Sequence, residues 1–328
     1  MPTWMTHFTD GATGTSQNLT GTPTNTGTSE VQNFNIIIRD SENQSHNRDF
    51  SLTVVDFPAG GESSFSGVSY PNTYTSGGVT YRVHVFTASG TTSSTSNFEV
   101  NADLVCDFLI VGGGGASTHA EGYSGSCGGA GAGGMVVGTS QTILASSSPY
   151  SITVGGGGAK GTSVSSMGGN GSNSSAFGYT AIGGGGSPDY GSDGASGGSG
   201  AGGSEPSRSA GSSTQDTYSG VTNVTGYGNA GGAGHSYPSG GSGGGGGANG
   251  AGQGATSGRA GGAGKTNAFR TGSDETYAKG GDGKDGDFSP SAPTAHTGNG
   301  SDGVSTNSGD NGGSQDGASG IVIIRYAI

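Results

Sequence analysis

Alternation of apolar and polar residues identifies short β-strands in the first third of the chain. Every second residue from Tyr81 to Val85 is apolar, and Arg82 and His84 lie between them, which is the period of a strand with one buried face. Similar runs of β-branched and aromatic residues occur elsewhere. They predict strands at 31–39, 50–55, 81–86, 96–100, 104–111, 150–154, 179–182 and 321–326.

Three of these strands run directly into four glycines. The strand at 104–111 is followed by Gly112 to Gly115, and the strands at 150–154 and 179–182 are followed by similar runs. The unequal spacing of the runs excludes a regular solenoid. The terminal strand at 321–326 is the first strongly apolar segment after a long glycine-rich stretch. We therefore expect it to return to the early sheet, with the intervening region as a long excursion from one end of that sheet.

Glycine supplies 66 of the 209 residues in 112–320, without the strict three-residue period of collagen. Flexible linkers are the usual state of Gly/Ser sequences, and they are the alternative here. An ordered solution is a bundle of polyglycine II helices, which have three residues per turn and direct every N–H and C=O outward. Without Cβ atoms, such helices approach closely enough to exchange hydrogen bonds. The result is a core held by backbone hydrogen bonds instead of hydrophobic side chains.

The expected fold is all-β, with small β-sandwich sheets and a glycine-rich lobe of packed polyglycine II helices. Residues 1–56 form an attachment module, 57–79 a linker and 80–328 a glycine-rich domain. Within this domain, 80–182 and 321–328 supply the sheet, and 183–320 supply the lobe and its variable loops. In the module, the polar stretch 40–49 joins two predicted strands as a hairpin.

The module resembles the second half of the immunoglobulin-like repeats of bacterial and phage surface proteins. The resemblance rests on LTGTPTNTG at 19–27 and on RDSENQSHNRDFSLTV at 39–54. Only about 20 residues precede the first of these motifs, where such repeats have further strands. The resemblance therefore implies a partial module, which completes itself against a partner chain.

The charge and composition of the chain restrict the classes of partner that it is expected to bind. The net charge is −12, with 11 Lys+Arg against 23 Asp+Glu, which disfavours binding to nucleic acid and to anionic membranes. The first residues carry no basic and apolar signal peptide, and no apolar run is long enough to span a membrane. Cys106 and Cys127 are expected to be free thiols, although a single bridge between them is an alternative.

Motifs that suggest chemistry are incomplete. The segment GRAGGAGKT at 258–266 imitates a phosphate loop, but its first required glycine would fall on Arg259. The segment GGDGKDGDF at 280–288 resembles a calcium-binding nonapeptide, for which Asp282, Asp285 and Asp287 would be the ligands, but the motif occurs once instead of in tandem. A carboxylate pair that hydrolyses glycans is a further alternative. We expect a protein without catalysis and without a cofactor.

The order YRVHVFTASGT, FEV, DFLIVGGGGA, GGAGAGGMVVG, YSITVGGGGAKG, YTAIGGGG and GASGIVIIRY across 80–328 resembles the glycine-rich domain of tailed-bacteriophage tail fibres and adhesins. That resemblance implies a tail-fibre tip that binds a host receptor through loops on a polyglycine II scaffold. Tyrosine offers large contact area at small entropic cost. The expected receptor-binding residues are therefore the loop aromatics Tyr190, Tyr218, Tyr227, Tyr237, Phe269, Tyr277 and Phe288.

The resemblance also sets the expected partners. They are a host cell-surface glycan or outer-membrane protein and, through residues 1–56, other virion proteins. The protein would be made in the host cytoplasm and carried on the virion, and it would form a homotrimer or cap another fibre. Two other functions stay open: a structural virion protein, such as a head fibre or capsid decoration protein, and an ice-binding protein.

Overall fold

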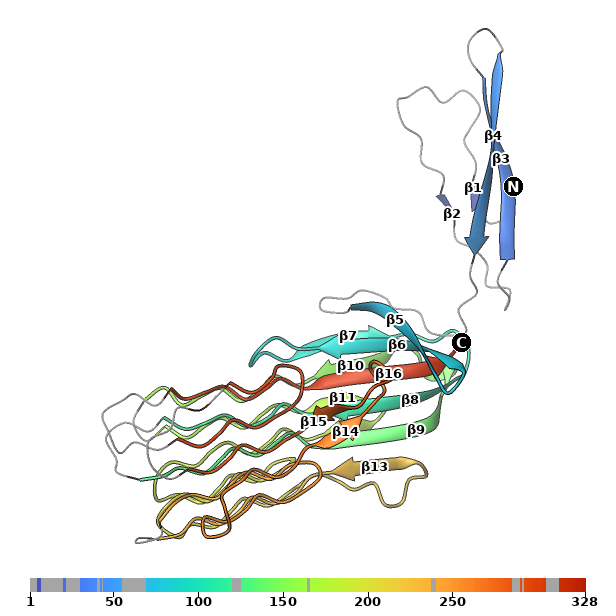
Figure 1. The fold of residues 1–328 in the computed structure, drawn as a ribbon. Coiled ribbons are helices and arrows are strands. Elements are labelled where there is room, and N and C mark those ends of the chain that lie inside the picture. Colours follow the sequence, from blue (N-terminus) through green and yellow to red (C-terminus); the bar gives the residue numbers. More distant parts are fainter. Residues whose placement is uncertain are drawn as a thin grey trace. The chain divides into compact units, whose positions relative to one another are not determined.

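The computed structural model describes residues 5–6, 20–21, 30–39, 42, 44–54, 69–119, 125–163, 166–236, 240–284, 290, 292–304 and 313–328. Its regular structure is almost entirely β (Figure 1). Among the described residues the one helical element is a 3₁₀ turn at Ala145–Ser147. The strands are β1 (Met5–Thr6), β2 (Thr20–Gly21), β3 (Glu30–Arg39), β4 (Ser45–Val54), β5 (Ser69–Ser76), β6 (Val79–Thr87), β7 (Ser94–Phe98), β8 (Leu104–Val111), β9 (Met135–Ile143), β10 (Tyr150–Val154), β11 (Ser174–Ala176), β12 (Tyr179–Ala181), β13 (Val224–Tyr227), β14 (Lys265–Asn267), β15 (Glu275–Tyr277) and β16 (Ile321–Ala327).

The chain divides into two compact units, Met1–Ala59 and Gly60–Ile328. In the first unit, β3 and β4 pair antiparallel from Glu30–Val54 to Arg39–Ser45, which confirms the expected hairpin and extends its second strand into the polar stretch. In the second unit, β5 lies within the range expected to be a linker. It forms an edge strand that pairs with β6, so the sheet begins before residue 80.

The last strand lies in the middle of the main sheet. This six-stranded sheet has the order β13-β9-β8-β16-β6-β5, and β16 pairs antiparallel with both β6 and β8. The return of the terminal strand to the early sheet is therefore confirmed. Because β16 is hydrogen-bonded on both edges and buried from Ile321 to Ile324, a fully apolar sequence suits this position.

Aromatic side chains join the main sheet to a second, four-stranded sheet of order β12-β11-β10-β7. His84 and Phe98 meet edge to face with ring centroids 5.3 Å apart. Phe108 stacks on Tyr179 at 5.3 Å, also across the two sheets. These contacts form a β-sandwich with an aromatic core, in accordance with the expected fold class.

A second hydrophobic core covers the other face of the main sheet. There the buried side chains of Val83, Leu109 and Ile323 pack with Phe269 and Tyr277, which belong to the β14–β15 hairpin region. The glycine-rich excursion thus returns to the sheet and covers its outer face. The main sheet is therefore buried on both faces.

The glycine-rich segments hydrogen-bond to one another with a repeat of three residues. Within 112–117, successive N–H groups donate to three different neighbouring segments, and residues three apart donate to the same neighbour. This is the geometry of a helix with three residues per turn, as in polyglycine II. The donor–acceptor pairs are Gly112–Gly134, Gly115–Gly131, Gly113–Ser172, Ala116–Gly169, Gly114–Ala318 and Ser117–Gln315, with N···O distances of 2.8–3.0 Å.

The segment 242–248 lies inside this lattice. Its N–H groups donate to three neighbouring segments and its carbonyls accept from three others, so six segments surround it. Its donors are bound by carbonyls at Gly200, Gly203, Gln253, Ala278 and Gly281, and its carbonyls accept from Gly129, Ala132, Gly232 and Gly262. The lobe is therefore a hexagonal array of extended segments, which run side by side away from the sheets in Figure 1.

Close approach, and not unusual backbone angles, explains glycine at most lattice positions. A Cβ on Gly113 would overlap the carbonyl oxygen of Gly156, and one on Gly245 would overlap that of Ala130. Neither glycine has a left-handed φ, so both backbones suit an L-residue. The lattice requires glycine because a neighbouring main chain occupies the place of the side chain.

Side-chain oxygens complete the lattice where no carbonyl reaches a backbone N–H. Asn170 Oδ1 accepts from the N–H of Gly186 at 2.7 Å, and Asp282 Oδ1 accepts from that of Gly261 at 2.8 Å. A buried N–H without a partner is costly, so these Asn and Asp residues are structural components of the lobe.

Candidate functional site

The turns at the end of the lobe away from the sheets form one continuous surface, which we call the distal row. Neighbouring turns are joined by hydrogen bonds: Gly191 N–H donates to Glu205 O at 2.8 Å, and Gly234 N–H donates to Arg208 O at 2.9 Å. A third contact joins the hydroxyls of Ser207 and Ser236 at 2.7 Å. The row comprises 188–193, 204–208, 235–236, 240–241 and 255–259, at the left of the lobe in Figure 1.

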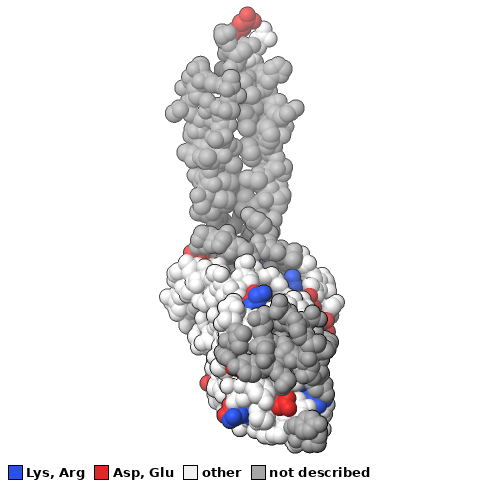
Figure 2. Space-filling model, turned by 90° about the vertical axis from the view of Figure 1, so that its left-hand side faces the viewer, with Lys and Arg blue, Asp and Glu red and all other residues white. Residues whose placement is uncertain are grey.

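Polar and charged side chains dominate the distal row. Asp193, Ser207 and Arg208 are exposed, and Glu205 is partly exposed. Asp193 Oδ1 accepts from the N–H of Ser209 at 2.9 Å, which anchors the turn to the next segment. Figure 2 looks onto this end of the lobe and shows acidic and basic side chains scattered among uncharged atoms. Such a surface favours hydrogen-bonded recognition over attraction by one sign of charge.

The expected receptor-binding aromatics do not converge on the distal row. Tyr190 lies there, half-buried against Cys127 and Val304. Tyr218 lies at the opposite end, where its hydroxyl accepts from Thr180 N–H at 2.9 Å and its ring meets Tyr179 edge to face. Tyr218 therefore extends the aromatic core of the sandwich.

Three further candidates belong to the core on the outer face of the main sheet. Tyr277 is 2% exposed and Phe269 is 8% exposed, and Tyr227 on β13 packs against the same cluster. Arg325 lies over the ring of Phe269, with its guanidinium carbon 4.1 Å from the centroid. Burial raises the pKa of Tyr277, and its hydroxyl donates to Glu275 Oε2 at 2.8 Å. These contacts give all three rings a packing role.

The remaining candidates, Tyr237 and Phe288, lie outside the described residues, as do Asp285 and Asp287 of the calcium motif. The third calcium candidate, Asp282, uses its carboxylate to bind the Gly261 N–H. Among the described residues, no group of three or more His, Cys, Asp or Glu side chains is placed to hold a metal ion.

Replacing Asp282 tests whether its carboxylate serves the lattice. We expect Asp282→Ala to lower the free energy of unfolding by about 1–3 kcal/mol, because the Gly261 N–H loses its acceptor. Asp282→Asn retains a side-chain oxygen and should cost less than about 1 kcal/mol. Chemical denaturation measures both values. Equal losses in the two variants, or a melting temperature that rises with calcium in the wild type alone, would contradict the lattice role.

The cysteines lie in separate environments. Both thiols are free and buried, Cys106 on β8 and Cys127 beside Val304 in the lobe. Burial raises the pKa of each thiol to about 12, so both are protonated at neutral pH. Since the thiolate is the nucleophile, neither cysteine is activated for covalent chemistry. The expectation of free thiols agrees with the structure.

The sequence analysis chose aromatic rings as the receptor-binding residues and therefore did not single out the polar residues of the distal row. The sequence did contain a signal for these residues. Short polar segments, such as SEPSRS at 204–209, separate the glycine runs, and the length of each run determines the end of the lobe at which the next turn lies. Single lattice segments such as 242–248 cross the lobe once. Alternate turns therefore lie at opposite ends.

The profile of the glycine-rich domain family matches residues 87–327. The chain belongs to this family. The match begins within β6 and ends within β16, so the glycine-rich domain includes both the main sheet and the hydrogen-bonded lobe. No curated protein matched the chain. No helix among the described residues is both long and apolar enough to cross a membrane.

Proposed function

We propose that this glycine-rich domain protein is a phage tail-fibre tip or adhesin, and that its distal row binds a receptor on the surface of a host bacterium without catalysis. The observation that carries the proposal is the arrangement of the distal turns. Each turn is held by its neighbours and by lattice segments, so exposed side chains are displayed from a hydrogen-bonded scaffold. Recognition surfaces gain affinity when they are ordered before binding.

The proposed mechanism combines small contacts with repetition. Serine, arginine and acidic side chains such as Ser207, Arg208 and Glu205 supply donors and acceptors that suit a surface glycan or the polar loops of an outer-membrane protein. Several copies on one particle would convert modest affinity at one site into lasting attachment. In this proposal the N-terminal unit joins the domain to other virion proteins.

The proposal is tested by retention of the labelled, full-length protein on a panel of intact bacteria. The distal variant Glu205→Ala/Arg208→Ala removes two side chains for which no side-chain hydrogen bond within the lobe is observed among the described residues. We expect strain-selective binding by the wild type and at least about tenfold weaker binding by this variant, because hydrogen bonds to charged groups contribute about 1.5–3 kcal/mol each.

A matched control also removes one arginine and one carboxylate side chain, at the opposite end of the lobe. Arg270→Ala/Asp274→Ala lies in the loop between β14 and β15, where both side chains are exposed and Arg270 forms an ion pair with Glu275 at 3.8 Å. This variant should bind as the wild type does. Loss of binding in the control alone would overturn the assignment to the distal row. Absence of binding to every strain would favour a head-fibre or capsid decoration role.

A further inference from the structure

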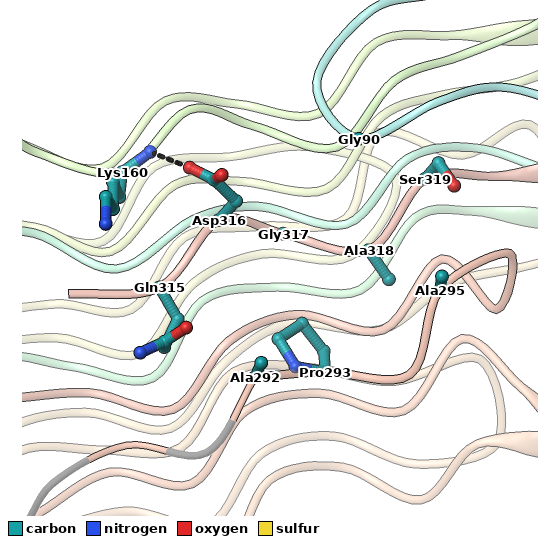
Figure 3. Close-up of a pocket in the computed structure, with 10 residues that line it drawn as sticks. All are labelled: Gly90, Lys160, Ala292, Pro293, Ala295, Gln315, Asp316, Gly317, Ala318 and Ser319. Carbon is teal, nitrogen blue, oxygen red and sulfur yellow. Dashed lines mark hydrogen bonds between the residues drawn. The ribbon is translucent and has the colours of Figure 1, made fainter. Parts of the chain in front are cut away.

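A groove of about 220 Å³ runs along the side of the lobe, beside the segment that leads into β16. Its floor is 315–319, with Gly90 and Lys160 on one side and Ala292, Pro293 and Ala295 on the other (Figure 3). The floor is held rigidly, since Gly317 N–H donates to Gly158 O at 3.0 Å and Ala318 N–H donates to Asn299 O at 3.0 Å. The groove is separate from the distal row.

Three polar side chains of the groove have free hydrogen-bonding capacity. Asp316 Oδ1 accepts from the backbone N–H of Lys160 at 2.9 Å, which orients the carboxylate and leaves Oδ2 without a partner among the described residues. The ammonium of Lys160 likewise has no ion-pair partner in that part of the chain. Gln315 donates through Nε2 to Gly313 O at 3.1 Å, so its Oε1 is left to accept.

The charges of the groove select the class of ligand. One ammonium and one carboxylate lie on the same short stretch of surface, so the groove carries no net charge from these groups. An anion would be repelled by the Asp316 carboxylate and by a chain of net charge −12, whereas a cation would be repelled by the Lys160 ammonium. Neighbouring hydroxyls satisfy both groups, because a hydroxyl donates to a carboxylate and accepts from an ammonium.

The shape and the apolar wall agree with this chemistry. Pro293, Ala292 and Ala295 offer carbon surface opposite the polar side chains, and a sugar ring carries both C–H surface and hydroxyls. The volume is below the ~300–1,000 Å³ of pockets for drug-sized ligands, so one or two rings suit it. We propose that this groove binds a neutral saccharide through Lys160, Gln315 and Asp316. The site lies outside the distal row, and the inference does not depend on the proposed adhesin function.

The test is NMR titration of the full-length, isotope-labelled protein. The neutral probes are glucose, galactose, mannose and N-acetylglucosamine, and the anionic probes are glucuronate and inorganic phosphate. We expect at least one neutral sugar to cause saturable shifts centred on the amides of Lys160, Gln315 and Asp316. The double variant Lys160→Met/Asp316→Asn should weaken that binding at least tenfold, because both charged hydrogen-bonding groups are removed.

The variants separate a lost site from a lost fold. Asn at position 316 retains an oxygen for the Lys160 N–H, and an unchanged amide spectrum away from the groove reports an intact lobe. Lys279→Met/Asp274→Asn changes the same residue types at exposed positions outside the groove and should bind as the wild type does. The inference is overturned if no neutral sugar shifts the groove amides, if the double variant binds equally well, or if an anionic probe binds more tightly.

Discussion

Replacing Gly245 with alanine is expected to unfold much of the glycine-rich lobe. Gly245 lies in the segment that six others surround, and a Cβ there would overlap the main-chain carbonyl of Ala130. A backbone cannot rotate away as a side chain can, so two segments must separate and several hydrogen bonds must lengthen. Overpacking a well-packed core costs about 1–3 kcal/mol, and we expect a loss of about 3 kcal/mol or more here.

Thermal and chemical denaturation measure this loss, and Gly254→Ala is the matched control. Gly254 has no left-handed φ, and the atom nearest to a Cβ at this position would be Ala233 O at 3.5 Å, an ordinary contact distance. This variant should be neutral or gain up to about 1 kcal/mol, since alanine restricts the unfolded chain. A similar stability for both alanine variants would refute the view that close main-chain approach sets the requirement for glycine.

The substitution Ile323→Asp is expected to prevent folding of the sheet. Ile323 is completely buried in β16, where it pairs with Val85 on one side and Leu109 on the other. A carboxylate there has no partner for its charge, and an uncompensated buried charge costs several kcal/mol. We expect a loss of about 4 kcal/mol or more, seen as insoluble protein or a collapsed thermal transition.

Ile328→Asp is the matched control, because it makes the same replacement at an exposed position near the C-terminus. Ile328 follows β16 and is 49% exposed, so an aspartate there remains hydrated. Its effect should be within about 0.5 kcal/mol of the wild type. If Ile323→Asp were as stable as Ile328→Asp, the central position of β16 between β6 and β8 would be wrong.

Local patterns predicted part of the glycine-rich domain, namely β6, β7, β8, β10, β12 and β16, but not β9, β11, β13, β14 or β15. Alternation of apolar and polar residues identified β6, because it suits a strand with one buried face. A continuous apolar run identified β16, because it suits a strand that is buried on both faces. The lobe was predictable because glycine runs that are ordered have few ways to satisfy their backbone groups. The sequence did not predict the first strand of the sheet, β5, because this strand contains Pro71 and many polar residues. An edge strand tolerates such residues.

The roles of individual aromatic residues were not predictable. Tyr190, Tyr218 and Tyr277 all lie in the long region between β12 and β16, yet Tyr190 lies in the distal row, Tyr218 extends the sandwich core and Tyr277 of β15 is buried against the main sheet. Their positions depend on which end of the lobe a turn reaches and on what packs over it. Neither is encoded within a few residues of the ring.

The sequence by itself determined that the protein is all-β, that its terminal strand returns to an early sheet and that its glycine-rich region packs through backbone hydrogen bonds. Composition and periodicity act locally, and they restrict these features strongly. Only the tertiary structure decided that β14 and β15 cover the main sheet, that polar turns adjoin in the distal row and that Lys160 and Asp316 share a groove. Those features depend on contacts between segments far apart in sequence, and such contacts are set by the packing of the whole lattice.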